Sequence, residues 1–439
     1  MACQPTFSHA FFCLLLTFLP IFLGQAELES QSHAPFTSFG ISQETNMEAV
    51  RPIVEERSTR GLSGSMGSEE EKALKQRYQL ARALLREGEE EKARRVFEQI
   101  WQTDSSHPLA AEAYFHSWPL SSYGRGEEAA IEHLQKLSER FPATFFSLCS
   151  YYLLANHWRK KATAHPLRRG FKRSMQRACS YYRRLQIEAE ARSSSLEARR
   201  QLAIHWLRCR ALLEETQAMR EIARHPTQLK KPYWLAKGAK KIEELFTLME
   251  GQQWAQEDNS DGSVWSYDLL AAARLEELAI ESDLGQLQQA RQDAEALLGS
   301  SWISGSPACA RYGVEAALLM SQLERRIGSV DCLLVWQQRG EQLLPATVAA
   351  ESLQVWLWME KAMMLEQLGS YDEAILALAK VINSDVASFC RIKAMMMRGE
   401  IYQKQGRWEL ASKQLKAVVA RGGLWAPHAE RVLKSLEQK

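Results

Sequence analysis

Two short segments near the C-terminus share one pattern, Gly369–Ala374 and Gly406–Ala411. In each segment an aromatic residue stands two positions after the glycine, and the alanine stands three positions after the aromatic residue. The two segments begin 37 residues apart. A repeat period in this range is typical of stacked helical hairpins, because one hairpin cannot bury its apolar face without a neighbour. The pattern therefore predicts a helical repeat protein, a class that usually binds other chains.

Small residues recur on both sides of the two glycine turns. Ala362 and Gly399 lie in the helix expected before each turn, and Ala374 and Ala411 lie in the helix expected after it. Small residues at these positions let two helices approach closely, while larger apolar residues fill the space between them. This arrangement resembles the tetratricopeptide repeat.

The resemblance is clearest over residues 355–420 and weaker over 74–142. It implies an all-α fold, a solenoid of helical hairpins that is irregular in its middle. The sequence departs from the family pattern at Lys361 and Arg398, which stand where the family has leucine, and at Val386 and Gly423, which stand where it has a terminal proline. The spacing of the two segments also exceeds the usual period of about 34 residues. Composition agrees with helices throughout, since only 13 prolines and 23 glycines interrupt a chain of 439 residues.

Composition also divides the chain into parts. An apolar leader is followed by a segment rich in Ser, Thr, Gln and Glu, whose low apolar content does not favour a packed core. Glycine turns expected at Gly88 and Gly328 place helical hairpins on both sides of a basic middle. We expect a signal peptide at 1–26, a disordered linker at 27–68, N-terminal hairpins at 69–142, a basic helical middle region at 143–300 and C-terminal repeats at 301–439.

The N-terminus has the features of an export signal. The stretch Ala10–Leu23 is uncharged and apolar over 14 residues, and the small residues Gly24 and Ala26 follow where a signal peptidase would cut. No Lys or Arg precedes this stretch, which departs from the usual signal. A membrane-spanning helix needs roughly 20 apolar residues, and Pro20 interrupts this stretch, so a permanent anchor is less expected than a cleaved signal. An uncleaved anchor or a buried helix stays open as the alternative. We expect an exported protein, periplasmic, in the cell envelope or secreted, that begins near Glu27.

The middle of the chain is strongly basic. Between His157 and Lys241, 22 Lys and Arg stand against six Asp and Glu, although the whole chain has a formal net charge of only +2. Such an asymmetry attracts anionic partners. Three interpretations stay open: a solvated basic face above a core of aromatic residues, an anionic partner such as an acidic protein, a membrane surface or a wall polymer, and nucleic acid. Nucleic acid is the least expected, because no groove-reading motif is present. The interleaved aromatic residues are Phe171, Tyr181, Tyr182, Trp206, Tyr233 and Trp234.

The sequence contains none of the common catalytic or phosphate-binding motifs. We therefore expect a chain without enzymatic activity, catalytic residues or a cofactor. His205 and Cys209 lie one helical turn apart and could both reach a zinc ion, but two ligands without a second pair are better explained as core residues. The carboxylates Glu214 and Glu215 are expected on a solvated helix face. The sequence thus predicts no metal site.

The segment 257–268 has a weak likeness to the calcium loop of an EF-hand, with oxygen-bearing residues and a glycine at similar positions. Its first ligand would be Glu257 instead of Asp, and its last would be Asp268 instead of Glu. A turn between two helices is the simpler interpretation.

The cysteines after the predicted signal are widely spaced along the chain. Dense disulfide frameworks belong to shorter chains, so buried free thiols are expected, with one or two disulfides as the alternative. These cysteines are Cys149, Cys179, Cys209, Cys309, Cys332 and Cys390.

The family resemblance also implies a partner-binding groove. In tetratricopeptide arrays the groove is lined by first-helix positions between the packing positions. An exposed tryptophan with three methionines there would form an adaptable apolar patch that accepts a helix or an extended peptide. The alternative is that an adjoining helix of this chain, over 426–436, covers the patch. The groove positions in this sequence are Trp356, Met359, Met363, Glu366, Gln367, Lys393, Met396, Glu400, Gln403 and Lys404.

Taken together, these features favour an exported, non-enzymatic scaffold for protein–protein interaction, with a protein or peptide partner whose identity the sequence does not reveal. Two alternatives stay open. One is a helical accessory or substrate-threading subunit of an envelope enzyme, and the other is an anionic-surface binder built on the basic middle region. No permanent membrane span is expected.

Overall fold

The computed structural model describes most of residues 69–437, and every regular element in this part of the chain is a helix. The predicted all-α fold is therefore confirmed. None of the described helices combines the length and the apolar character that crossing a bilayer requires. The predicted signal peptide and linker, 1–68, lie outside the described residues, as do the short stretches 106, 122–125, 143, 165–169, 193–197, 226–227, 251–261, 348–349, 385–387 and 423–424.

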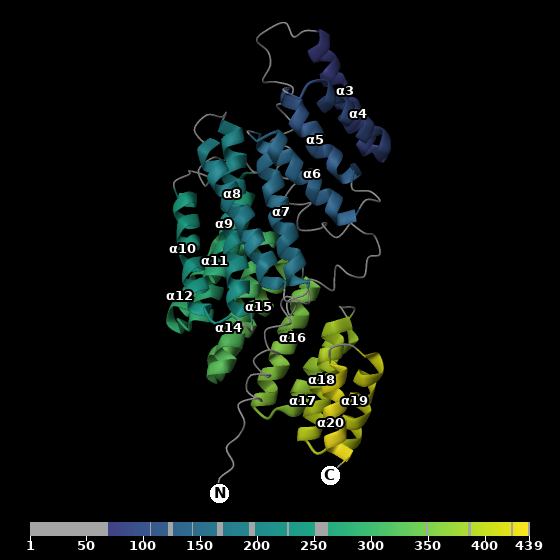
Figure 1. Ribbon diagram of the computed structural model, residues 1–439. Coiled ribbons are helices and arrows are strands. Elements are labelled where there is room, and N and C mark those ends of the chain that lie inside the picture. The colour runs from purple at the N-terminus through teal and green to yellow at the C-terminus, as the bar shows by residue number, and fades with distance from the viewer. Residues whose placement is uncertain are drawn as a thin grey trace. The chain divides into compact units, whose positions relative to one another are not determined.

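The described residues form two compact units, one up to residue 249 and the other from residue 250 onward. The expected basic middle region, 143–300, is thus divided between the two units. The helices of the first unit are α3 (Glu69–Arg86), α4 (Glu90–Thr103), α5 (Pro108–Ser121), α6 (Gly126–Arg140), α7 (Phe145–Thr163), α8 (Phe171–Arg192), α9 (Ala198–Arg224) and α10 (Lys231–Glu250) (Figure 1). The helices of the second unit are α11 (Gly262–Leu284), α12 (Leu287–Gly299), α13 (Ser301–Gly305), α14 (Pro307–Ile327), α15 (Val330–Leu343), the 3₁₀ turn η2 (Leu344–Ala346), α16 (Ala350–Gln367), α17 (Tyr371–Asn383), α18 (Ser388–Lys404), α19 (Trp408–Arg421) and α20 (Ala426–Glu437).

In the described part of the chain, five helical hairpins are closed by the same glycine turn. At Gly406, with φ 72°, the amide of the glycine donates to the carbonyl of Gln403 at 3.0 Å and the next amide, of Arg407, donates to Tyr402 at 2.9 Å. This left-handed conformation favours glycine because it has no Cβ, and the two bonds satisfy carbonyls at the end of the first helix. The following helix begins two residues after the glycine in every case. The five turns are at Gly88, Gly285, Gly328, Gly369 and Gly406.

The turn at Gly285 was not anticipated from the sequence, whereas the other four were. It joins α11 to α12. The last four turns follow one another at intervals of 43, 41 and 37 residues, so the repeat is longer than the usual period of about 34 residues and varies along the chain.

Small residues lie at the helix contacts, as the repeat register predicts. Ala362, Ala374 and Ala411 have no exposed surface. A Cβ added to Gly399 of α18 would lie 2.9 Å from Cδ2 of Leu415 on α19. These two helices therefore approach more closely than a larger side chain would allow.

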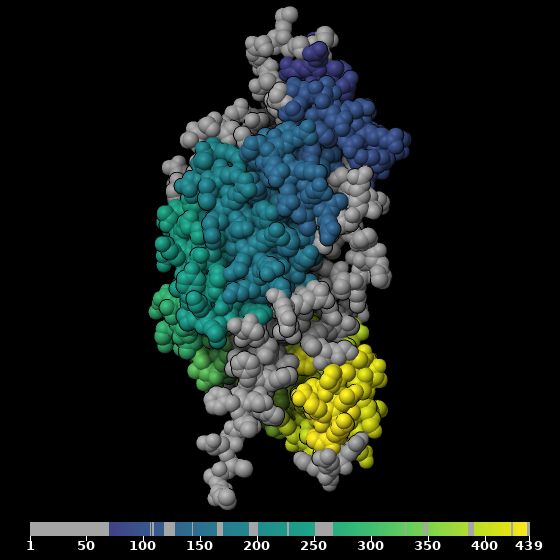
Figure 2. All heavy atoms as spheres, viewed as in Figure 1, coloured from purple at the N-terminus to yellow at the C-terminus, as the bar shows by residue number. Residues whose placement is uncertain are grey.

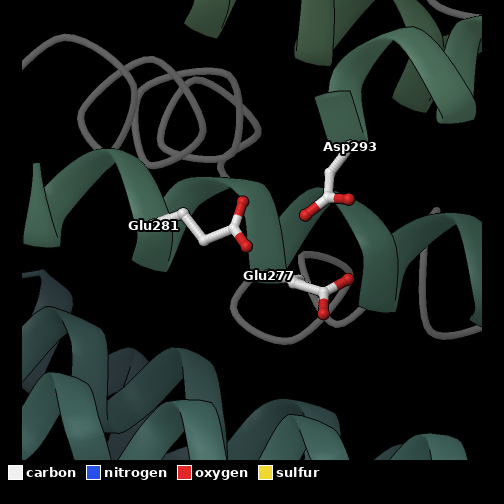
Figure 3. Close-up of side chains that lie close together, drawn as sticks. All are labelled: Glu277, Glu281 and Asp293. Atoms are coloured by element: carbon white, nitrogen blue, oxygen red, sulfur yellow. The ribbon is translucent and has the colours of Figure 1, made fainter. Parts of the chain in front are cut away.

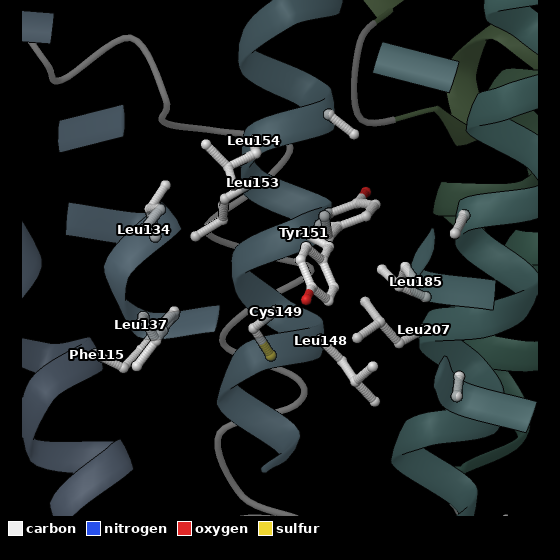
Figure 4. Packing of buried hydrophobic residues seen from close by; sticks show 14 of the residues in the cluster. Phe115, Leu134, Leu137, Leu148, Cys149, Tyr151, Leu153, Leu154, Leu185 and Leu207 are labelled. Carbon is white, nitrogen blue, oxygen red and sulfur yellow. The ribbon is translucent and has the colours of Figure 1, made fainter. Parts of the chain in front are cut away.

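The core of the first unit is organised around α7, which contributes buried residues on most of its sides. In Figure 4, Leu134 and Leu137 of α6 lie on one side of α7, and Leu185 of α8 and Leu207 of α9 lie on the other. The first half of α7 carries no charged residue, which is typical of a helix that is surrounded by others.

The paired carboxylates of α9 are not solvated, so that expectation was wrong. The exposed fraction is 7% for Glu214 and 0% for Glu215. Arginines from neighbouring helices pair with them: Arg159 of α7 pairs with Glu214, and Arg183 of α8, whose side chain is 47% exposed, pairs with Glu215 at 2.9 Å. Burial opposes the ionisation of Glu214, but Arg210 and Arg159 hold the pKa of this carboxyl below its ordinary value. Part of the basic charge of this region is thus neutralised by buried carboxylates of the same unit.

Most aromatic residues of the basic region belong to the core, which supports the first of the three interpretations for them. Tyr233 is the exception, with 57% of its surface exposed. The others are buried or half-buried against core residues, and these are Phe171, Tyr181, Tyr182, Trp206 and Trp234.

The cysteines of the described part are free thiols, and all of them except Cys332 are buried. Burial raises the pKa of Cys149, Cys179 and Cys209 to about 12. These thiols are therefore unreactive at neutral pH. Five of the six cysteines are buried as expected, whereas Cys332 is half-buried.

Candidate partner-binding site

The groove positions predicted from the sequence lie on α16 and α18 at spacings of three or four residues, so they form one stripe along each helix. Three of them are not accessible. Met359 has no exposed surface, Met396 has 2% and Lys393 has 7%. The expectation that the methionines form an exposed patch is therefore wrong for Met359 and Met396, because both side chains are enclosed in the hydrophobic core of the unit.

The rest of the stripe is open to solvent to different degrees. Trp356 and Met363 of α16 are half-buried and pack against the core, whereas Gln367 and Lys404 are exposed. We call the accessible part the α16–α18 face; it consists of Trp356, Met363, Glu366, Gln367, Glu400, Gln403 and Lys404. Apart from Trp356, these residues lie in the C-terminal halves of the two helices, so the face is most open there.

Two polar pairs connect neighbouring helices across this face. Lys404 of α18 pairs with Glu366 of α16 at 2.6 Å, and the side chain of Lys404 is 54% exposed. His428 of α20 lies 2.9 Å from Glu400 of α18. The helix expected as a cover, 426–436, therefore does reach this face, at Glu400, while its own Ala429 is buried in the core of the unit.

A line of buried charges lies beneath the face, and sequence analysis missed it. Arg325 of α14 pairs with Glu360 of α16 at 2.5 Å, and Glu360 is only 1% exposed. Burial raises the pKa of Glu360 and lowers that of Lys393 to about 8, while the two groups attract each other. Lys393 also lies over the ring of Trp356, 5.7 Å from its centroid, and so supports the tryptophan of the face from inside.

A second pair, Arg291 with Glu324 at 2.5 Å, has a similar spacing in the sequence. The partners are separated by 33 residues here and by 35 residues in the pair of Arg325 with Glu360. The sequence therefore contained a signal for these ion pairs, namely residues of opposite charge about one repeat apart. It could be interpreted only once the repeat register placed both members of each pair at the contact between consecutive hairpins.

Three carboxylates lie together on α11 and α12, at Glu277, Glu281 and Asp293 (Figure 3). Their oxygen atoms are within 4.8 Å of one another. Burial and the neighbouring Asp293 raise the pKa of Glu281 to about 8, so this carboxyl is mostly protonated at neutral pH and the like-charge repulsion is relieved. A cluster of this kind is common on helix surfaces and does not by itself define a ligand.

The residues considered for zinc, His205 and Cys209, are described by the structure, whereas the segment considered for calcium, 257–268, is described only in part. Nε2 of His205 hydrogen-bonds the carbonyl of Leu248 at 3.2 Å, and Cys209 has no exposed surface. Cys209 is therefore a core residue, as expected, whereas His205 is half-buried. Of the calcium-like loop, residues 257–261 lie outside the described part of the chain, and Asp268 lies within α11.

Comparison with known proteins gives one match to a family. The model of the tetratricopeptide repeat matches residues 357–385, which span most of the α16–α17 hairpin. No curated protein sequence matches this chain. Among solved structures, a tetratricopeptide repeat protein from Parabacteroides merdae is similar at 10% identity and a TM-score of 0.40, covering 74% of this chain and 97% of its own. The tetratricopeptide domain of P58(IPK) is similar at 12% identity and a TM-score of 0.24, covering 83% and 98%. The resemblance inferred from the glycine turns is confirmed over 357–385, and the chain carries a tetratricopeptide repeat there.

Proposed function

We propose that this chain is an exported, non-enzymatic scaffold that binds a protein or peptide partner on the α16–α18 face. The observation that carries the proposal is the half-exposed pair Trp356 and Met363, which lies on α16, the first helix of the matched repeat hairpin. Aromatic and methionine side chains at a rigid helical surface make adaptable apolar contacts.

The rim of the face indicates the character of the partner. Lys404 with Glu366 places both signs of charge within one helical turn of Met363, and His428 with Glu400 adds a second polar pair. A partner helix or extended segment with an apolar anchor and flanking charges fits such a surface, because the apolar residue supplies affinity and the charges fix orientation.

Capture from a native extract tests this binding. Two baits are compared, the intact protein and a variant with Trp356→Ala and Met363→Ala. We expect a defined partner to be retained by the first bait and lost by the second, while the far-UV circular dichroism of the two baits stays close. Since Trp356 also packs against the core, the exposed change Lys404→Glu provides a second variant that leaves the core intact. Capture that is equal for all three baits contradicts the proposal, and a wall hydrolase among the retained proteins would favour the enzyme-accessory alternative.

The export part of the proposal rests on the apolar stretch Ala10–Leu23 and the small residues after it. We expect the native protein to begin near Glu27 and to be found outside the cytoplasmic membrane. Mass spectrometry of its N-terminal peptide checks this. An intact Met1 on a cytosolic protein is the contrary result.

A further inference from the structure

Four helix ends come together at one end of the α7–α10 group. A core cluster joins Ala162 near the end of α7, Phe171 at the start of α8 and Ile222 near the end of α9, and Trp234 at the start of α10 packs against it. The ring of His225, which follows α9, stacks on Phe171 at 4.5 Å between centroids. We call this region the basic end. In Figure 2 the helices of this group form the continuous blue to teal surface.

The charges at the basic end are almost all positive. No Asp or Glu occurs between residues 157 and 187, and Glu221 is the one acidic residue between 216 and 241. Glu221 is 7% exposed and pairs with Arg159 at 2.6 Å, so it does not add negative charge to the surface. The exposed basic residues gathered at this end are Lys160, Lys161, Lys172, Arg173, Lys230 and Lys231.

Apolar side chains project from the middle of this charge. Leu229, in the turn between α9 and α10, is 97% exposed, and Tyr233 in the first turn of α10 is 57% exposed. Lys230 and Lys231 lie between them in the chain. A leucine this exposed is unfavourable in water and gains free energy by entering any apolar phase.

We propose that the basic end docks on an anionic membrane surface, with Leu229 and Tyr233 entering the headgroup region and the surrounding lysines and arginines facing anionic lipid headgroups. Protruding leucine and tyrosine flanked by lysines suit a soft interface, because the apolar groups are buried without a preformed hollow on the partner. The positive charges add attraction to the negative surface potential of the bilayer. The contact is peripheral and reversible, and it is a binding activity additional to that of the α16–α18 face.

The same observations disfavour the other polyanions. Binding of single-stranded nucleic acid relies on successive free aromatic faces. Tyr233 is exposed at this end, but the ring of Trp158 is covered by Arg177 at 4.3 Å and by Lys161 at 5.3 Å. Phe171 is buried under His225. An acidic peptide would use the charges but would give no role to a leucine that projects outward.

Vesicle sedimentation with the full chain tests the proposal. Vesicles of phosphatidylglycerol mixed with phosphatidylcholine are compared with vesicles of phosphatidylcholine alone, and the excess binding to the anionic vesicles is measured. The apolar stretch 10–23 is uncharged and contributes to both kinds of vesicle, so the excess reports the basic end. We expect Leu229→Ser to weaken the affinity for the anionic vesicles about tenfold, because the charges hold this end at the surface and a leucine that is buried there contributes at least that much. The double change Lys230→Glu and Lys231→Glu should weaken the affinity for the anionic vesicles by at least about tenfold, since two attractive charges are replaced by two repulsive ones.

A matched control distinguishes binding through the basic end from non-specific binding through any exposed apolar residue. Ile187 on α8 is 62% exposed and lies toward the opposite end of that helix, so Ile187→Ser should leave the excess binding unchanged. Equal binding by the Leu229→Ser variant and the unaltered protein overturns the insertion of Leu229 and with it the proposal. No excess on anionic vesicles also overturns it; if a single-stranded oligonucleotide or an acidic peptide then binds through Lys230 and Lys231, that polyanion takes the place of the membrane.

Discussion

Replacing Arg159 with methionine is expected to destabilise the first unit by about 3 to 5 kcal/mol, the range typical when one member of a buried ion pair is removed. Arg159 of α7 lies between two carboxylates of α9, and its side chain is 19% exposed, against 9% for Glu214 and 5% for Glu221. Glu214 keeps a second partner in Arg210 at 2.7 Å. Glu221 loses the ion pair with Arg159, and a buried carboxylate without a compensating charge is costly.

Arg94 is a matched control for this substitution. Its side chain is 21% exposed, close to that of Arg159, but its partners Glu91 and Glu98 are 58% and 32% exposed. Arg94→Met should therefore cost no more than about 1 kcal/mol. Chemical denaturation of both variants decides the matter, and adding Glu221→Leu to Arg159→Met should recover much of the loss. Similar small effects for Arg159→Met and Arg94→Met would mean that the inner network does not stabilise the unit.

The second large effect concerns Lys393 and pH. Burial lowers the pKa of this lysine to about 8 from the ordinary value of 10.5. Below pH 8 both the native and the unfolded chain hold the proton, and the native state carries the full cost of the buried charge. Between about pH 8 and 10.5 the unfolded chain binds the proton and the native chain does not, so the contribution of Lys393 to the free energy of unfolding rises with pH, by about 3 kcal/mol in all.

Lys393→Met should therefore stabilise the second unit at pH 7, and the difference from the unaltered protein should shrink as the pH rises above 8. Glu360 keeps its partner Arg325 in this variant, so no carboxylate is left alone. Denaturant unfolding of both proteins at pH 7 and at pH 10 measures the difference, and other titrating groups cancel because they are common to both. A difference that is the same at the two pH values would show that Lys393 is not held in a desolvated site.

The parts of the fold that were predictable from the sequence are those that local chemistry decides. A glycine with a left-handed conformation between two amphipathic segments marks a hairpin wherever it stands, and a small residue such as Ala374 marks a helix contact. Gly285 has the same geometry as Gly406, but Leu287 stands two positions later, just as Glu90 follows Gly88 and Val330 follows Gly328 without an aromatic residue. The sequence pattern was therefore narrower than the structural repeat.

The positions that were predicted wrongly depend on how hairpins stack, which no local pattern encodes. Met359 and Met363 are one helical turn apart and chemically identical, yet the first is enclosed and the second is half-exposed. Glu214 and Glu360 resemble solvated charges because their partners, Arg159 and Arg325, are 55 and 35 residues away. The basic end, in turn, becomes visible only when the antiparallel course of α7–α10 brings separate basic segments to one place.

Site-specific photo-crosslinking tests the central claim, protein binding on the α16–α18 face, most directly. A photoreactive amino acid is placed at Met363 or at Gln403 on this face, and, as a control, at Leu376, which is 66% exposed on α17. After irradiation of the protein in its native extract, we predict one discrete partner adduct from positions 363 and 403 and none from position 376. Adducts from position 376 alone, or no adduct from either position on the face, would contradict the account.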